Sequence, residues 1–176
     1  METMEEKSER VKAIDSLVEV YIKKGVLSNA LKAAKLGASP QKIDSLVEVY
    51  IKKGWFSDAQ EAAKLGRRKF STQEIDSLVE ACIKKGKLSD ALKAAKLGRR
   101  KFSTQEIDSL VEVYIKKGWF SDAQEAAKLG ASPQKIDSLV EVYIKKGELN
   151  AAQKAAKLGR RKLSTQEIDS LVEVVR

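Results

Sequence analysis

"IDSLVEVYIKKG", at residues 136–147, is one of six copies of the same phrase in this chain. Its apolar residues recur at i, i+3, i+4, i+7 and i+8, which is the spacing of an amphipathic α-helix with one apolar face. Two lysines and a glycine end the phrase, and both features are typical of a helix C-terminus. The sequence therefore predicts the same helix six times. The other copies, one of them varied and the last cut short, occupy residues 14–25, 43–54, 75–86, 107–118 and 168–176.

A second, shorter helix is expected after each complete copy. The stretch "WFSDAQEAAKLG" at residues 55–66 places three alanines on one side of a helix and ends in a glycine. Ser57 and Gln60 have the spacing of an N-cap and its N3 partner, so we expect Ser57 to cap this helix. Because alanines let helices approach closely, each unit is predicted to be a helical hairpin that buries its apolar face against the next hairpin.

Two kinds of loop join these units. In the short loop, "ASPQK", a serine precedes a proline, which predicts an N-cap followed by the first helical residue. The long loop, "RRK(F/L)STQE", contains the capping-box pair of a serine and a glutamate three residues later, as at Ser71 and Glu74. The two loops make the repeat length alternate between 29 and 32 residues.

The positions that recur most strictly are a leucine, a tyrosine, a glycine and an alanine, as in Leu46, Tyr50, Gly54 and Ala59. This spacing resembles the tetratricopeptide and pentatricopeptide superfamily of helical-hairpin repeats, over residues 10–176. The resemblance implies an all-α, right-handed α-solenoid of five short helix-turn-helix repeats plus a C-terminal half repeat. It would form a single repeat domain, residues 1–176, with units at about 10–37, 39–66, 71–98, 103–130, 132–159 and 164–176.

The copies are unusually alike, since residues 43–66 and 107–130 are the same 24 letters. Such identity favours an engineered or consensus-like array, or a very recent duplication. The repeats are also shorter than the roughly 34 residues of a tetratricopeptide unit. Ile14, Ile43 and Ile75 stand where that family has an early tryptophan.

The composition argues against an enzyme. The chain has no histidine, which removes the usual base for a serine or cysteine nucleophile and the usual nitrogen ligand of zinc. Its one cysteine, Cys82, replaces a recurring tyrosine on an apolar helix face and is expected to be a small buried residue. We expect no catalytic residue, metal site or cofactor. The start, "METMEEKSER", lacks the layout of a signal peptide and no apolar run suits a membrane span, so a cytoplasmic location is expected.

Charged residues form a stripe along the predicted first helices. Asp15, Glu19 and Lys23 lie at i, i+4 and i+8, and every complete copy repeats them. The resemblance implies that this stripe faces the concave groove of the solenoid, where it would bind a protein or a basic or amphipathic peptide. A solvated face held by Glu–Lys pairs is the other interpretation. The candidate groove residues are Asp15, Glu19, Lys23, Asp44, Glu48, Asp76, Glu80, Asp108, Glu112, Asp137 and Glu141.

The excess of positive charge is confined to three loops. The chain has 34 basic and 25 acidic residues, a net charge of +9, and three "RRK" segments hold nine of the basic ones. This clustering gives an alternative function, weak and non-specific binding of nucleic acid such as single-stranded RNA through its phosphates. The candidate residues are Arg67, Arg68, Lys69, Arg99, Arg100, Lys101, Arg160, Arg161 and Lys162.

Apolar residues at two kinds of position are candidates for contact with other chains. Trp55 and Trp119 follow the hairpin glycine at a position that carries Lys or Glu in other units, so they are either contact anchors or partly packed side chains. No second helix follows the last copy of the phrase to cover its apolar face. We expect self-association there, through Leu171, Val172 and Val175, to give a homo-oligomer.

Overall fold

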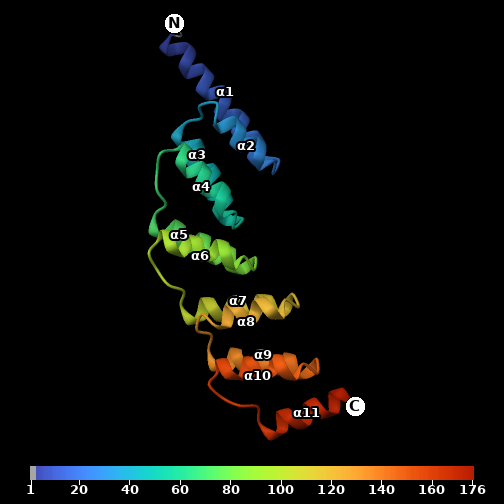
Figure 1. The fold of residues 1–176 in the computed structure, drawn as a ribbon. Coiled ribbons are helices and arrows are strands. Elements are labelled where there is room, and N and C mark those ends of the chain that lie inside the picture. Colours follow the sequence, from blue (N-terminus) through green and yellow to red (C-terminus); the bar gives the residue numbers. More distant parts are fainter. Residues whose placement is uncertain (1–2) are drawn as a thin grey trace. The chain divides into compact units, whose positions relative to one another are not determined.

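The computed structural model describes residues 3–176 and is all-α, with eleven helices and no strand over those residues (Figure 1). Met1 and Glu2, the first residues of the predicted repeat domain, lie outside the described residues. Consecutive helices form packed pairs, among them α1 with α2, α3 with α4, α7 with α8 and α9 with α10. The helices are α1 (Met4–Lys23), α2 (Leu27–Ala34), α3 (Pro40–Lys52), α4 (Phe56–Leu65), α5 (Thr72–Lys84), α6 (Leu88–Leu97), α7 (Thr104–Lys116), α8 (Phe120–Ala127), α9 (Pro133–Lys145), α10 (Leu149–Leu158) and α11 (Thr165–Val175).

The chain divides into two compact units. One contains residues 3–82 with Asp90–Gly98, and the other contains Ile83–Ser89 with Arg99–Arg176. In the first unit α3 contacts both helices of the preceding hairpin, α1 and α2. In the second unit α9 likewise contacts α7 and α8, and α11 packs on α9. The helical hairpins predicted from the sequence are confirmed, and within each unit their packing is compatible with a helical repeat array.

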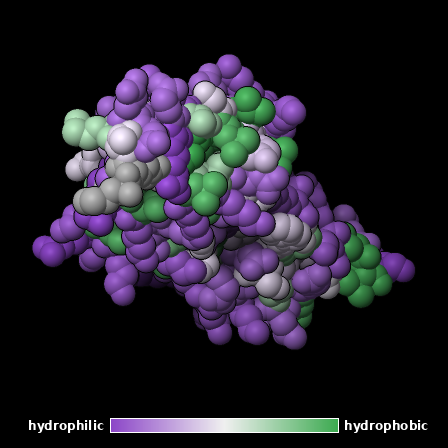
Figure 2. All heavy atoms as spheres, turned by 90° about the horizontal axis from the view of Figure 1, so that it is seen from above, coloured by the Kyte–Doolittle hydropathy of each residue, from purple (hydrophilic) through white to green (hydrophobic). Residues whose placement is uncertain are grey.

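The core of each hairpin lies between a helix with large apolar residues and a helix with alanines. In α3 the buried residues include Leu46, Val47 and Tyr50, and in α4 they include Ala59 and Ala62. Each large apolar side chain buried in this way contributes roughly 1.5–3 kcal/mol relative to an exposed one. Charged and polar side chains are absent from the buried set among the described residues. Figure 2 shows hydrophilic residues covering most of one face of the molecule, with hydrophobic residues in smaller areas between them.

The first helices begin where the loop sequences predict. Ser39 and Ser132 are N-caps followed by a proline, as expected for the short loop. In the long loops Ser103 with Glu106 and Ser164 with Glu167 form complete capping boxes. Each cap satisfies backbone N–H groups that have no partner within the helix, so the loops fix where the following helix starts.

The predicted cap of the second helix is wrong. α4 begins at Phe56, with Trp55 as its N-cap residue and no side-chain cap, so Ser57 lies inside the first turn. The reason is the tight turn after Gly54, which has a φ of 62°. In that turn the Trp55 N–H donates to the carbonyl of Tyr50 at 3.0 Å, and the Trp55 carbonyl already accepts from Ala59. The hairpin turn therefore places the N-cap two residues before the serine.

The recurring tyrosine of the first helix contacts the second helix of the preceding hairpin. Tyr50 Oη donates to the carbonyl of Leu27 at 2.8 Å, and Tyr143 Oη donates to the carbonyl of Phe120 at 2.9 Å. In α7, Tyr114 Oη accepts from the N–H of Leu88 at 3.2 Å. Burial raises the pKa of Tyr50 to about 12, so its hydroxyl keeps its proton at neutral pH. Each hydroxyl thereby ties one hairpin to the previous one.

In α5 the tyrosine is replaced by Cys82, and the neighbouring valine by Ala81. These small side chains let the α5 backbone approach the turn between α3 and α4, so that a Cβ on Gly54 would lie 3.0 Å from the Ala81 carbonyl. The Cys82 thiol is fully buried and donates a weak hydrogen bond to the Gly54 carbonyl at 3.6 Å. The prediction that Cys82 is a small buried residue is confirmed.

The first testable prediction concerns the tyrosine hydroxyls. Tyr50→Phe removes the hydrogen bond to Leu27 from a buried site and should lower the free energy of unfolding by about 1 kcal/mol. Tyr21→Phe is the matched control, because Tyr21 lies on α1, the first helix of residues 3–176, and it should be close to neutral. Urea unfolding followed by circular dichroism measures both changes. Equal losses in the two variants would contradict the assigned role.

Candidate functional site

At the short loops, a carboxylate of one first helix holds the start of the next first helix. Asp15 Oδ1 accepts from the backbone N–H of Ser39 at 2.8 Å, and Asp108 Oδ1 does the same with Ser132, also at 2.8 Å. One turn further along α1, Glu19 contacts Lys42 of the next helix, with 2.8 Å between Oε2 and Nζ. These short junctions therefore use the charged stripe to position the following hairpin.

The same stripe contains a second set of ion pairs, each within one helix, in α1, α7 and α9. Glu19 also contacts Lys23 at 2.8 Å, and hydrogen bonds from Lys23 and Lys42 lower the pKa of Glu19 to about 2. Glu112 has the equivalent partners, Lys116 at 2.7 Å and Lys135 at 3.2 Å, and its pKa is lowered for the same reason. At these two positions each glutamate already forms ion pairs with two lysines.

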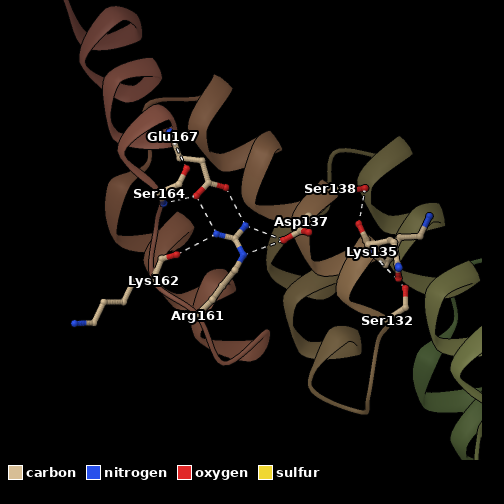
Figure 3. A network of polar contacts seen from close by, with 9 residues as sticks. Ser132, Lys135, Asp137, Ser138, Arg161, Lys162, Ser164 and Glu167 are labelled. Atoms are coloured by element: carbon tan, nitrogen blue, oxygen red, sulfur yellow. Dashed lines mark hydrogen bonds and ion pairs between the residues drawn. The ribbon is translucent and has the colours of Figure 1, made fainter.

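At the long loops, the second arginine of the "RRK" segment, rather than a serine N–H, contacts the aspartate of the preceding first helix (Figure 3). Arg161 donates through Nε and Nη2 to Asp137 Oδ1, at 3.0 and 2.8 Å. Its Nη1 and Nη2 also donate to the two oxygens of Glu167, both at 2.9 Å. The guanidinium thus bridges α9 and the capping-box glutamate of α11, in a planar two-point contact that lysine could not make. We call this arrangement the arginine clamp.

The second arginines of the other two long loops pair with their capping-box glutamates in the same way. Arg68 Nε lies 2.6 Å from Asp44 Oδ1, and Arg68 donates to both oxygens of Glu74 at 3.0 and 2.8 Å. Arg100 donates to both oxygens of Glu106 at the same distances. Three of the nine candidate cations of the basic loops are therefore engaged with carboxylates. The other six cations of these loops are exposed: Arg67, Lys69, Arg99, Lys101, Arg160 and Lys162.

An open groove lies beside the clamp between α9 and α11. Its volume is about 540 Å³, and its lining is mainly polar, with Gln134, Asp137 and Glu141 from α9 and Gln166 and Ser170 from α11 among the residues. It brings together two of the candidate groove residues, Asp137 and Glu141, with the clamp arginine. Glu141 is exposed and contacts Lys145 of its own helix at 2.8 Å. The groove can hold a polar partner by hydrogen bonds and by charge.

The remaining candidate groove residues lie on the first helices as predicted from their spacing. Glu48 is exposed on α3, and Asp76 and Glu80 are exposed on α5. Sequence reasoning missed that the aspartates contact the next loop. The sequence does contain a signal of contact between a first helix and the next loop. Every "ASP" loop is followed by a lysine at the third helical position, whereas every "RRK" loop is followed there by a glutamate.

The two tryptophans are partly exposed at the starts of α4 and α8. Trp55 lies against Tyr50 with 6.0 Å between ring centroids, and Trp119 lies against Tyr114 at the same distance. The ammonium of Lys117 lies 4.6 Å from the Trp119 ring, which favours a cation–π contact. Each ring is therefore packed on one side and leaves part of its surface to solvent.

The apolar residues of α11 divide between the interior and the surface. Leu171 is buried within the chain, whereas Val172 and Val175 are exposed. Of the three candidate self-association residues, only the two valines therefore offer surface to another molecule.

Within residues 3–176, no helix is long and apolar enough to cross a membrane. The same residues contain no group of three or more His, Cys, Asp or Glu side chains that could hold a metal ion. In comparisons with known proteins, no family model and no curated protein matches the chain.

The second prediction concerns the arginine clamp and acid. Hydrogen bonds from Arg161, aided by the Ser164 N–H, lower the pKa of Glu167 below its ordinary value of 4.5. A carboxyl with a lowered pKa stabilises the fold above pH 4.5, and this contribution is lost as the pH falls through the folded-state pKa. Arg161→Met should therefore cost about 1 kcal/mol at neutral pH and should reduce the loss of stability on acidification.

Arg160→Met is the matched control, because Arg160 is exposed and has the same charge. It should leave both the neutral-pH stability and the acid response close to those of the parent chain. Thermal unfolding between pH 7 and pH 3 measures both quantities. An Arg161 variant with an unchanged acid response would contradict the clamp.

Proposed function

We propose that the protein is a non-enzymatic repeat scaffold that binds protein or peptide segments along the polar face of its first helices. The proposal includes a right-handed α-solenoid of five hairpins and a half repeat, similar to tetratricopeptide and pentatricopeptide arrays, which the repeated phrase and the packed hairpins support. The observation that carries it is the open polar groove between α9 and α11. Polar groups that converge on a concave surface can fix the orientation of a ligand.

The charge of this groove favours a cationic partner. Three carboxylates, those of Asp137, Glu141 and Glu167, line it together with one guanidinium, that of Arg161, which gives a formal charge of −2. The clamp already neutralises part of this charge, because Arg161 contacts both Asp137 and Glu167. Glu141 is the carboxylate left outside the clamp, so we assign it the contact with a lysine or arginine of the partner.

The third prediction separates this binding role from the structural role of the stripe. Glu141→Gln should weaken the binding of a labelled Lys/Leu peptide about fivefold, as expected when one partly screened charge pair is lost. Glu112→Gln is the matched control, because Glu112 occupies the equivalent position and has the same intrahelical lysine contact as Glu141, but also contacts Lys135 of the next first helix. It should affect stability more than affinity. Fluorescence anisotropy measures the affinities.

An acidic peptide of the same length should not bind to this groove. Tight binding of that peptide, or equal losses of affinity in the two glutamine variants, would overturn the proposed function.

A second candidate function, weak binding of nucleic acid, rests on the exposed outer cations of the "RRK" loops. Arg67 and Lys69 flank the engaged Arg68 and are exposed, and the other two loops have the same arrangement. Such cations contact phosphate without reading the bases. The clamp leaves two cations per loop rather than three, so the charge available to a phosphate backbone is smaller than the sequence alone indicates.

The fourth prediction tests this candidate with single-stranded RNA at two salt concentrations. At low salt we expect sequence-independent binding in the ~10⁻⁴–10⁻⁶ M range, lost as salt rises because affinity comes from counterion release. Serine at all six exposed loop positions should abolish it and preserve helicity, since the clamp arginines remain. Salt-resistant, sequence-selective binding would instead favour RNA recognition like that of pentatricopeptide proteins.

Three expectations stay as predictions beside these proposals. The near-identical copies favour an engineered or consensus-like origin. A cytoplasmic location follows only from the sequence pattern. Self-association through α11 is expected to use Val172 and Val175, the exposed members of the predicted set.

A further inference from the structure

The first arginine of each "RRK" segment has an unusual backbone conformation. Arg67, Arg99 and Arg160 have φ angles of 52°, 52° and 55°, and over residues 3–176 they are the three non-glycine residues with a positive φ. In this left-handed region the Cβ of an L-residue comes too close to the backbone, and for that reason glycine is its usual occupant. We call these three residues the left-handed arginines.

The end of the second helix requires this conformation. After α4, the Arg67 N–H donates to the carbonyl of Lys64 at 2.9 Å, and the Arg68 N–H donates to the carbonyl of Ala63 at 3.1 Å. These two bonds form the Schellman motif, in which the residue after the C-cap is left-handed. The loop after α10 has the same two bonds. Because Arg68 is the last residue of the motif, the left-handed turn also directs the chain into the arginine clamp.

Packing explains why the neighbouring glycine does not occupy the left-handed position. Gly66 is the C-cap residue before Arg67, and its φ is −75°. A Cβ on Gly66 would lie 3.1 Å from Ile43 Cγ2, and a Cβ on Gly98 or Gly159 would lie 3.0 or 3.3 Å from the equivalent isoleucine. The close approach of the two helices therefore requires glycine at the C-cap, and the left-handed position falls on the next residue. A second glycine would fit there without strain, but all three long loops have an arginine.

The side chains of the left-handed arginines do not stabilise the described part of the chain. All three are exposed, and over residues 3–176 their guanidinium groups form no hydrogen bond or ion pair. The short loops differ, because their residues with positive φ are glycines, Gly37 and Gly130. Strained backbone positions in native proteins cluster at functional sites. A strained arginine without an internal contact, present in every long loop, indicates that its guanidinium contacts another molecule.

The composition of the long loops favours nucleic acid over protein as that molecule. Arg67 and Lys69 are exposed, whereas the one apolar side chain before the N-cap serine is half-buried in each loop: Phe70, Phe102 and Leu163. Protein interfaces are centred on apolar and aromatic side chains, and these loops do not offer such an anchor. Phosphate groups bind to cations alone, and one guanidinium can contact two phosphate oxygens at once.

We propose that the left-handed arginines are the residues that contact the phosphates of single-stranded nucleic acid, each guanidinium holding one phosphate. This inference rests on the second candidate function and deepens it, since it separates two kinds of exposed cation in the long loops. Lys69, Lys101 and Lys162 add positive charge nearby, whereas the left-handed arginines make the directional contact. Binding and stability are therefore opposed at these positions, because the residue that binds is not the residue that the backbone favours.

The fifth prediction replaces all three left-handed arginines with glycine. Glycine adopts a positive φ without strain, so the midpoint of thermal unfolding should rise by about 2–4 °C or more. The affinity for a fluorescein-labelled oligouridine at low salt should fall at least about tenfold, because the phosphate contacts are lost. The slope of log K against log salt should become shallower by about 0.7 for each lost contact. Circular dichroism and fluorescence anisotropy measure the two effects.

Two matched variants separate charge from backbone strain. Glycine at Lys69, Lys101 and Lys162 removes the same charge from the same loops, but it should weaken binding less than about threefold and should not raise the unfolding midpoint. Lysine at the three left-handed arginines keeps the charge and the strained backbone but lacks the planar guanidinium. It should leave the unfolding midpoint at that of the parent chain and weaken binding about threefold.

Four results would overturn the proposal. The two glycine variants could lose affinity equally, or the variant without the left-handed arginines could gain no thermal stability. A Glu/Leu peptide could bind these arginines more tightly than the RNA does, which would make an acidic protein segment their partner. A parent chain that binds no RNA at low salt would also remove the second candidate function, so that failure is distinct from one confined to the left-handed arginines.

Discussion

Each helical hairpin of this chain depends on its neighbour for the burial of its apolar residues. A pair of short helices has apolar residues on more than one side, so a hairpin alone leaves part of them in water. Within each compact unit the next hairpin covers them, and Leu46 and Val47 of α3 are fully buried. The alanines of the second helices make this possible, because their small side chains let the helices approach closely. Burial of these residues is the main source of stability.

Apolar contact alone does not fix how one hairpin sits on the next, and the polar junctions supply that information. At a short loop, Asp15 accepts from the N-cap serine of the next helix. At a long loop, Asp137 contacts Arg161, which also contacts the capping-box glutamate Glu167. In both cases the contact joins an aspartate on one helix to the start of the next. Directional hydrogen bonds are what give such a contact a preferred register.

The sequence predicted the helices and most of their caps, because those depend on local spacing and on the chemistry of serine, proline and glycine. It failed at Ser57, since the turn after Gly54 fixes the helix start through backbone bonds that side-chain patterns do not reveal. It also did not reveal that Asp15 and Asp137 contact the next loop. Those contacts depend on how successive hairpins pack, and spacing within one helix does not contain that information.

The contact between the aspartate of a first helix and the loop that follows has a consequence for how such an array can change in length. The first helices carry the same aspartate whichever loop follows, and each loop brings a partner for it: the N–H of the N-cap serine in a short loop, or the clamp arginine in a long loop. Recombination that deletes or inserts a whole repeat, cut within the shared phrase, therefore joins two compatible halves and keeps a loop partner for the aspartate. Repeats with either kind of loop are therefore interchangeable at these junctions.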